Sequence, residues 1–422
     1  MKLLIIGNGP AAVNALKAIA ANQKDNSHLV TLVSHENSPA YSPMFLSDYL
    51  SGNLQEKDLF IEEIVDLDVE KKLGQKLVGI DGLQRKVLTD SGEELEYDNL
   101  LIASGASPLK LPIPGMDKSD VYYFNRISDV QGLYRALKTA EGVIVIGAGA
   151  IGIEVAMVLN KIGKSVVVMD MQARILPEML EETLSQYFQG ILEAKGIRFL
   201  LGYPVEEIIG NESAEGVMSQ NRMIQGDLII MATGIKPNID FIESSGIVVN
   251  KGIVVNDKMQ TNIPSIFAAG DVAESIDPYG ESELVFNYYN AIDQGWVAGC
   301  NMIGVKRSLC LSPILSVIKG SNPVVCSIGR CYHSIEYEII RNDDIRKGIL
   351  ERFYINNNVI YCYQSIGIQN KLGLIYNYIK CRKDIGHIRD KLLTAFETEY
   401  SMPYIFANFQ GHYLQAYLSE GS

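Results

Sequence analysis

The chain has 422 residues, enough for two or three domains, and its 47% hydrophobic and 21% charged residues are typical of a folded globular protein. A formal net charge of −13 excludes nucleic acid as the main partner, because phosphate binding draws on clustered lysine and arginine. The six cysteines contain no C-x-x-C pair, so we predict no metal or cluster site and regard buried free thiols as the simplest interpretation.

Residue 1 leads directly into an apolar segment at residues 2–6, without the charged, apolar and cleavable regions of a signal peptide. Another long apolar stretch, residues 143–160, is interrupted by three glycines and by Glu154, which favours a strand, a turn and a helix over a membrane span. We therefore expect a cytoplasmic protein that starts folding at residue 1 and has no membrane span.

A strand, a glycine turn and a helix follow one another twice along the chain. The first glycine of such a turn allows a tight bend, the second lets the backbone approach a pyrophosphate, and the third position must be small. The helix N-terminus then offers free N–H groups to the phosphates. The candidate phosphate-binding residues are Gly7, Gly9, Pro10, Ala11 and Ala12 in the first copy and Gly147, Gly149, Ala150, Ile151 and Gly152 in the second.

Each copy continues with a second strand followed by a carboxylate, which can bind a ribose hydroxyl: Glu36 after residues 28–33 and Asp170 after residues 165–169. A third apolar strand then stops in small residues that let a ligand come close to the backbone. These residues are Ala103, Ser104 and Gly105 in the first copy and Ala232, Thr233 and Gly234 in the second.

Two complete dinucleotide motifs in one chain predict two different dinucleotides. The simplest combination is a tightly bound flavin cofactor and a nicotinamide cosubstrate that binds and dissociates in each turnover. Met171 and Gln172 follow Asp170, and no arginine stands before Arg174 to hold a 2′-phosphate. The sequence therefore favours NADH over NADPH.

With these motifs, residues 1 to about 305 resemble the pyridine nucleotide-dependent flavoprotein reductases, the class that contains glutathione reductase. The run from Thr261 to Val272 is similar to the second flavin motif of that family, and residues 232–238 and 291–302 are also typical of it. The resemblance implies that Gly270 and Asp271 bind FAD together with the first copy, and that the second copy binds NAD(H). It also implies a catalytic role for Glu154 in orienting the nicotinamide; the alternative is a solvated or capping carboxylate in the first turns of a helix.

The fold class implied by the resemblance is α/β, with two Rossmann-like, glutathione reductase-like dinucleotide-binding domains and a smaller α+β C-terminal interface domain. We expect the FAD-binding domain at residues 1–115 and 241–305, the NAD(H)-binding domain at 116–240, and the C-terminal interface or docking domain at 306–422.

Residues 39–50 are similar to the NADH:rubredoxin reductase and nitrite reductase flavin-domain branch of the family. Disulfide reductases carry a C-x4-C pair or a single cysteine on the helix after the first βαβ unit, whereas no cysteine occurs here before Cys300. A thiolate stacked on the flavin is therefore not expected from this region. Cys326 and Cys331 have the C-x4-C spacing of a redox disulfide, but they fall in the C-terminal domain.

Residues 306–422 carry 14 basic and 10 acidic residues, a net charge of +4, against 23 and 40, a net charge of −17, in the rest of the chain. They also hold 11 of the 22 tyrosines. Strands are expected at 323–326, 349–355 and 358–363, and helices at 372–379 and 390–396. This composition suits a docking face, and the alternative is an ordinary domain with evenly spread charge and core tyrosines.

The predicted docking face combines a basic cluster with an aromatic tail. The cluster consists of Lys380, Arg382, Lys383, Arg389 and Lys391, and the tail of Tyr404, Phe406, Phe409, Tyr413 and Tyr417. The alternative is that the tail packs on its own domain or on a second copy of the chain.

The leading hypothesis is an FAD-dependent NADH:acceptor oxidoreductase that passes electrons between NADH and a protein. The acceptor would be rubredoxin, ferredoxin or an iron–sulfur partner subunit, and the chain could serve a larger redox complex with molybdenum or tungsten enzyme subunits. One alternative is a stand-alone small-molecule reductase or H2O2-forming NADH oxidase, and another is an assembly or NADH-sensing flavoprotein subunit. The sequence leaves homo-oligomer formation open.

Overall fold

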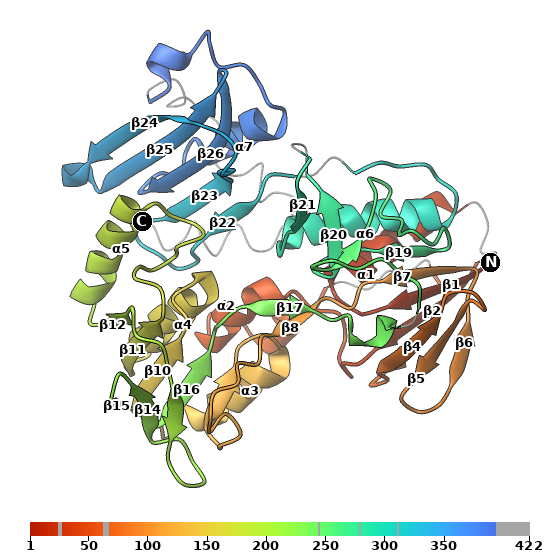
Figure 1. Ribbon diagram of the computed structural model, residues 1–422, viewed down its shortest axis with the longest axis horizontal. Coiled ribbons are helices and arrows are strands. Elements are labelled where there is room, and N and C mark those ends of the chain that lie inside the picture. The colour runs from red at the N-terminus through yellow and green to blue at the C-terminus, as the bar shows by residue number, and fades with distance from the viewer. Residues whose placement is uncertain (24–27, 62–66, 244, 278–279, 310–311, 394–422) are drawn as a thin grey trace. The chain divides into compact units, whose positions relative to one another are not determined.

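The computed structural model describes residues 1–23, 28–61, 67–243, 245–277, 280–309 and 312–393. Within these ranges the chain forms two compact units (Figure 1). The first unit combines Met1–Leu111, Tyr123–Arg135 and Thr233–Ser312; the second combines Pro112–Tyr122, Ala136–Ala232 and the chain from Pro313 onward. The three-domain boundaries expected from the sequence stay a prediction.

The central sheet of the first unit is parallel, in the order β19-β7-β1-β2-β3. Leu3, Leu4 and Ile5 of β1 are almost fully buried, as expected for a parallel strand covered on both faces. The strands are β1 (Lys2–Ile6), β2 (Leu29–Ser34), β3 (Val69–Leu73), β7 (Asn99–Ile102) and β19 (Ile266–Ala268).

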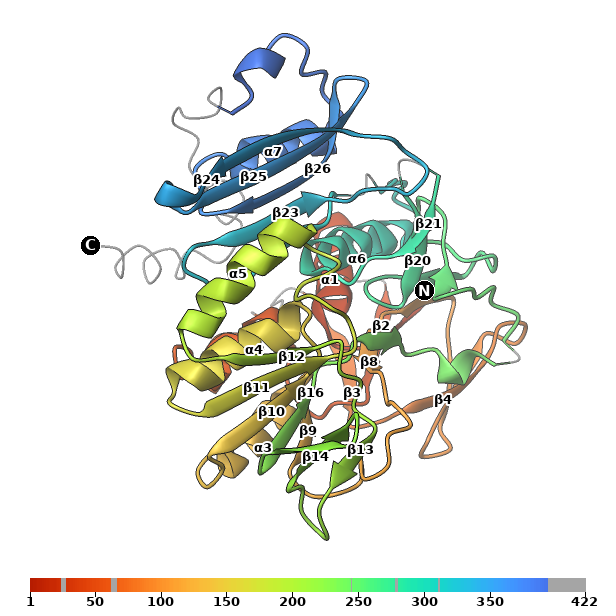
Figure 2. The same cartoon turned by 60° about the vertical axis from the view of Figure 1, so that its left-hand side comes forward.

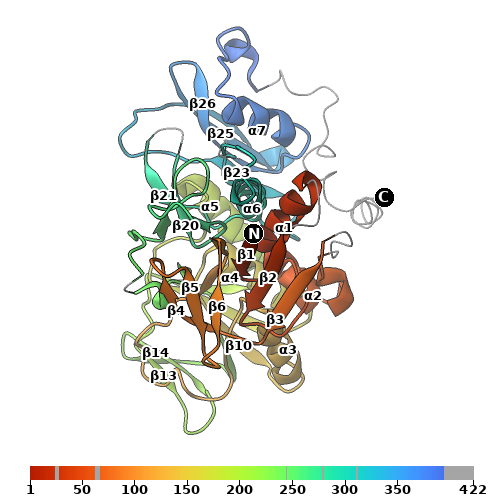
Figure 3. The same ribbon diagram turned by 90° about the vertical axis from the view of Figure 1, so that its right-hand side faces the viewer.

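Helix α1 (Pro10–Asn22) lies beside α6 (Tyr288–Met302), as Figure 3 shows. Glycines on α6 allow this close approach: a Cβ at Gly295 would lie 2.1 Å from the carbonyl oxygen of Ala11, and one at Gly299 would lie 2.4 Å from that of Ala15. The glycines of α6 therefore let α1, and with it the turn that precedes α1, pack directly against α6.

Smaller sheets complete the first unit. Strand β8 (Ala106–Pro108) pairs antiparallel with β17 (Ile235–Pro237). The other elements are β4 (Leu77–Asp81), β5 (Lys86–Thr89), β6 (Glu94–Glu96), β18 (Ile253–Val254), β20 (Ala273–Ile276), β21 (Ser282–Leu284), α2 (Leu46–Leu50) and α3 (Ile127–Ala136).

The second unit repeats the parallel arrangement in a sheet of order β12-β11-β10-β16-β9 (Figure 2). Its register matches that of the first sheet, because Ile146 pairs with Met169 as Ile6 pairs with Val33. The elements are β9 (Val121–Tyr123), β10 (Gly142–Ile146), α4 (Ala150–Lys161), β11 (Ser165–Asp170), α5 (Glu182–Ala194), β12 (Arg198–Leu201), β16 (Leu228–Met231) and the antiparallel β13 (Glu207–Ile209), β14 (Gly216–Ser219) and β15 (Arg222–Gln225).

An antiparallel sheet of order β22-β23-β26-β25-β24 follows in the same unit, with α7 (Leu372–Lys380) against β23 and β26. Its strands are β22 (Leu315–Val317), β23 (Val325–Gly329), β24 (Glu338–Asp344), β25 (Ile349–Asn356) and β26 (Val359–Ile366). These elements confirm the strands expected at 349–355 and 358–363 and the helix expected at 372–379. The strand expected at 323–326 begins only at Val325.

The helix expected at 390–396 is wrong in its described part, which contains only a 3-10 turn at Arg389–Lys391. Residues 394–396 and the aromatic tail from Tyr404 to Tyr417 lie outside the described residues. Across the described part of the chain, no helix combines the length and the apolar character that a membrane span requires.

Candidate dinucleotide-binding sites

The first glycine turn joins β1 to α1 and leaves the helix N-terminus open. Gly7 has φ +108°, and a Cβ there would lie 2.0 Å from the carbonyl oxygen of Ala103, so the fold itself requires glycine. Gly9 is the N-cap of α1, and a Cβ on it would meet no atom within 4 Å. Pro10 opens the helix, and Ala11 and Ala12 are buried in its first turn. Open space therefore lies where the first helical N–H groups need an acceptor.

The second glycine turn joins β10 to α4 in the same way. Gly147 has φ +114°, and Gly149 is the N-cap, with nothing within 4 Å of a Cβ. A Cβ at Gly152 would lie 1.9 Å from the carbonyl oxygen of Gly147, so this position admits no larger residue. Ala150 and Ile151, the first residues of α4, are exposed. The second helix thus also presents an open N-terminus.

The ends of the third strands lie next to these turns. The amide of Ala103 donates to the oxygen of Ile6 at 2.7 Å, and the amide of Ala232 donates to that of Ile146 at 2.8 Å. A Cβ at Gly152 would lie 3.4 Å from the Cβ of Ala232, so Ala232 borders the second turn.

Thr233 and Gly234 instead belong to the first unit with Ser104 and Gly105. The Ser104 hydroxyl donates to the Asn238 carbonyl oxygen at 2.9 Å, and the Asn238 amide group donates to the Ser104 oxygen at 2.8 Å. The amide of Asn238 also donates to the carbonyl oxygen of Gly105 at 2.9 Å. Asn238 therefore ties together two segments that the sequence assigned to different nucleotides.

The two predicted ribose-binding acids differ in position and in contacts. Asp170 is the last residue of β11, and its carboxylate accepts the amide of Ala148 at 2.7 Å and that of Gln172 at 2.8 Å. Glu36 lies two residues beyond the end of β2, so its register equivalent in the second copy is Gln172, not Asp170. Asp170 thus supports its own glycine turn, whereas Glu36 does not.

Glu36 is held by two side chains that sequence reasoning had not assigned to a site. The Tyr41 hydroxyl donates to Glu36 Oε2 at 2.8 Å, and Arg126 Nε lies 3.9 Å from Glu36 Oε1. Desolvation, together with the Glu36 charge, raises the pKa of Tyr41 well above its usual range, so the hydroxyl remains a donor. Tyr41 stood in the segment typical of the family branch, but no motif marked Arg126, which comes from the start of α3.

Beside the first turn, the Asp271 carboxylate and Asn290 Nδ2 have no hydrogen-bond partner among the described residues. Gly270 precedes Asp271 and links it to α6, because its amide donates to Gln294 Oε1 at 2.7 Å. Desolvation raises the pKa of Asp271 to about 6, and its carboxylate accepts no hydrogen bond from any described residue. Asn290 is 2% exposed, and its Nδ2 likewise has no partner there. These unpaired groups fit a ligand with hydroxyl and carbonyl groups, such as FAD.

Glu154 lies on α4, and its Oε1 accepts the amide of Lys319 at 3.0 Å, just after β22. This bond connects the helix of the second turn to the C-terminal sheet within the second unit. The role of Glu154 toward a nicotinamide stays a prediction.

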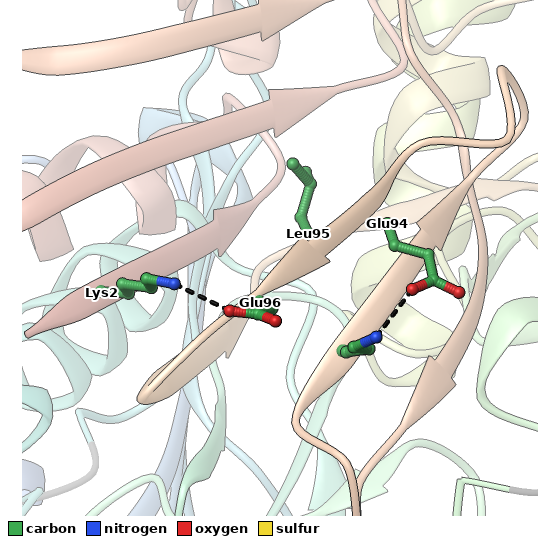
Figure 4. A pocket seen from close by; sticks show the side chains of 5 residues that line it. Lys2, Glu94, Leu95 and Glu96 are labelled. Atoms are coloured by element: carbon green, nitrogen blue, oxygen red, sulfur yellow. Dashed lines mark hydrogen bonds and ion pairs between the residues drawn. The ribbon is translucent and has the colours of Figure 1, made fainter.

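A surface hollow is lined by Lys2, Lys86, Glu94, Leu95 and Glu96, none of which belongs to the predicted nucleotide-binding residues (Figure 4). Its charges neutralise each other, because Lys2 pairs with Glu96 and Lys86 with Glu94, each at 2.8 Å. Among the residues that the structure describes, no group of three or more His, Cys, Asp or Glu side chains could hold a metal ion.

Two parallel sheets, each with a glycine turn and an open helix N-terminus, define a protein of the two-dinucleotide oxidoreductase class. Residues 1–295 match the family described as pyridine nucleotide-disulphide oxidoreductase, and the chain belongs to this family. Membership confirms the predicted fold class, the enzyme class of FAD-dependent oxidoreductases, and FAD and NAD(H) as cofactors.

Three curated relatives illustrate the match. A nitrite reductase [NAD(P)H] of Bacillus subtilis (strain 168) is 32% identical over 391 residues, which are 91% of this chain and 48% of that protein. An assimilatory nitrate reductase electron transfer subunit of the same organism is 37% identical over 279 residues, 65% of this chain and 36% of that protein. The NADH-rubredoxin oxidoreductase of Clostridium acetobutylicum is 30% identical over 325 residues, covering 75% of this chain and 79% of that one.

The chain therefore spans about half or less of the length of the two Bacillus proteins. Among solved structures, a covalent putidaredoxin reductase–putidaredoxin complex matches with a TM-score of 0.85 at 21% identity, over 94% of this chain and 99% of the other. At that identity the match supports the fold alone.

Proposed function

We propose that the chain passes electrons between NADH and a protein acceptor by way of FAD. In this proposal the first glycine turn, Glu36, Asp271 and Asn290 hold FAD, and the second turn and Asp170 hold NADH. Bound flavin takes up two electrons together and can release them singly, which suits transfer from a hydride donor to a one-electron carrier. The chain's own residues bind the phosphates, orient the riboses and keep the two nucleotides in separate sites.

The observation that carries the proposal is the absence of cysteine from residues 1–299, although two dinucleotide turns occur there. A thiol pair in that part of the chain therefore cannot take electrons from the flavin, and this supports transfer of the electrons to another molecule. The names of the relatives agree with this, since one is an NADH-rubredoxin oxidoreductase and another an electron transfer subunit.

The acceptor in this proposal is an iron–sulfur protein such as rubredoxin or ferredoxin, or a partner subunit that carries an iron–sulfur, molybdenum or tungsten centre. Copurification from the native source identifies such a subunit and also reports whether the chain forms homo-oligomers. A cytoplasmic location remains a prediction.

Stopped-flow mixing with NADH tests the function. We expect the flavin absorbance to bleach rapidly and to return only when a cluster protein is added. Return with air or quinone alone would instead establish the small-molecule reductase or H2O2-forming oxidase. If NADH did not bleach the flavin absorbance, the result would favour an assembly or NADH-sensing role for the chain.

We further propose that the acceptor docks on the C-terminal domain. Lys380, Arg382 and Lys383 are exposed at the end of α7 and after it, and they belong to the basic portion of an otherwise acidic chain. Arg389, a further member of the basic cluster, pairs with Glu338. An acidic carrier would be repelled elsewhere and attracted here.

Charge reversal tests this docking face. Arg382→Glu with Lys383→Glu should leave NADH oxidation by an artificial dye unchanged while transfer to the native acceptor falls and loses its salt dependence. Arg222→Glu, a charge reversal at another exposed residue, on β15, is the control. Deleting residues from Pro403 onward tests the tail separately. Equal loss of both activities would mean that the altered region supports the fold.

A further inference from the structure

Two cysteines far apart in the sequence meet on the C-terminal sheet. Gly329 ends β23 with φ +75° and pairs in register with Cys362 of β26. A Cβ at Gly329 would lie 2.1 Å from the Tyr361 carbonyl oxygen, and the amide of Arg330 donates to that oxygen at 3.3 Å. The chain therefore leaves β23 in close contact with β26, which brings Cys331 near Cys362, and the two thiols interact electrostatically.

The two thiols differ in access. Cys331 is exposed, whereas Cys362 is only 2% exposed. The interaction with Cys362 lowers the pKa of Cys331, and the same interaction together with burial raises the pKa of Cys362 well above its usual value. An exposed thiol with a lowered pKa beside a buried thiol is the arrangement of an attacking and a resolving cysteine.

The surroundings hold this pair in place. The Tyr337 hydroxyl accepts the amide of Tyr332 at 2.9 Å, and the Tyr337 ring packs edge-on to Tyr354 and Tyr361. Burial raises the pKa of Tyr337 to about 12, so it adds no negative charge that would oppose a thiolate. Arg330, directly before Cys331, is the neighbouring cation, 5.1 Å from the centre of the Tyr332 ring.

Cys326, which has the C-x4-C spacing to Cys331, differs from Cys362 in its surroundings. Cys326 is fully buried on β23, and burial raises its pKa far above the usual value. Cys381 is exposed after α7 and offers a comparison of similar access.

We propose that Cys331 and Cys362 form a peroxide-reactive thiol site that closes reversibly as a disulfide. The Cys331 thiolate attacks hydrogen peroxide: an S–O bond forms, the O–O bond breaks, and the departing hydroxide takes up a proton to become water. The Cys362 sulfur then attacks the sulfenic acid, an S–S bond forms, the S–O bond breaks, and a second water leaves. Two thiols and one peroxide thus give one disulfide and two waters, and a small dithiol reverses the oxidation.

The test uses the full-length, reduced protein treated with increasing hydrogen peroxide, followed by non-reducing peptide mapping. We expect a cross-linked peptide joining Cys331 to Cys362, formed severalfold faster than oxidation of Cys381, because the neighbouring Cys362 lowers the pKa of Cys331 and offers a second sulfur within reach. Dithiothreitol should remove the cross-link. In Cys362→Ser, Cys331 should accumulate as a sulfenic acid that dimedone traps.

Cys381→Ser is the matched control and should leave the cross-link unchanged. Should Cys362→Ser fail to fold, the wild-type map and the exposed substitution Cys331→Ser still decide the matter, since Cys331→Ser should abolish the cross-link. Oxidation of Cys331 at the rate of Cys381, or a cross-link that joins Cys331 to Cys326, would overturn the proposal. None of these readouts depends on the proposed electron transfer.

Discussion

The two glycine turns share one backbone plan but are stabilised differently. In the second unit, Asp170 accepts the amide of Ala148 and Gly152 leaves no room for a methyl group. In the first unit the register equivalents are Ser34 and Ala12, and the acid Glu36 bonds Tyr41 while lying close to Arg126. Equal strands and turns therefore do not imply equal nucleotide contacts, and the four predictions below test how far the two sites differ.

The largest effect is expected at the third position of the turn. Gly152→Ala should lower the free energy of unfolding by about 3 kcal/mol or more, because its Cβ would overlap the Gly147 oxygen. Gly149→Ala, with open space around its Cβ, should change stability by less than about 0.5 kcal/mol. Urea unfolding measures both. Equal losses of stability in the two variants would show that any substitution in the turn is destabilising, and that the close contact between residue 152 and the Gly147 oxygen is not the cause.

The next change separates the two cofactors. Gly9→Leu should give a colourless protein because the side chain would occupy the space proposed for the FAD phosphates. Gly149→Leu should leave the protein yellow but without flavin bleaching by NADH. Absorbance spectra before and after NADH addition measure both outcomes. Exchanged phenotypes would reverse the assignment of FAD and NADH to the two halves.

A pH dependence should distinguish the FAD site. Folding raises the pKa of Asp271 from 3.8 to about 6, so the FAD-free folded chain keeps a proton that the unfolded chain releases. The stability conferred by this proton is present below about pH 4 and lost as the pH rises through about 6. Hydroxyl groups donate best to the ionised carboxylate, so FAD affinity should increase about tenfold from pH 5 to pH 7 and then level off.

Fluorescence titration of FAD-free protein measures this affinity, and Asp271→Asn should remove its dependence on pH. If FAD affinity still depended on pH in the same way in Asp271→Asn, the titrating group would be a residue other than Asp271.

The smallest expected effect concerns the acids. Asp170→Ala should weaken NADH binding by about 1–2 kcal/mol, because a charge-assisted bond to ribose is lost and Ala148 loses its acceptor. Asp170→Asn keeps an oxygen for Ala148 and should cost less. The Michaelis constant for NADH reports both variants, and Glu36→Gln should leave it unaltered. An unchanged constant in Asp170→Ala would remove Asp170 from the site.

The turns and helix starts of both sites could be predicted from the sequence, because they depend on interactions between residues close together in the chain. Gly7 and Gly147 take positive φ values, Gly9 and Gly149 cap helices, and the buried strands pair in the expected parallel order. Each of these features depends on residues that are neighbours in the chain, so spacing alone could predict them. The same reasoning failed at residues 390–396, where apolar spacing suggested a helix and the described part forms a 3-10 turn.

Contacts between distant segments could not be predicted in this way. Arg126 reaches Glu36, Lys319 binds Glu154, and Cys331 meets Cys362 instead of Cys326, although no spacing in the sequence marks these pairs. Desolvation of Asp271 and Asn290 likewise requires α6 to lie beside α1. The sequence alone determined the repeated nucleotide-binding turns and the family. Only the tertiary structure decided which side chains surround them, because burial and long-range pairing arise when separate segments pack together.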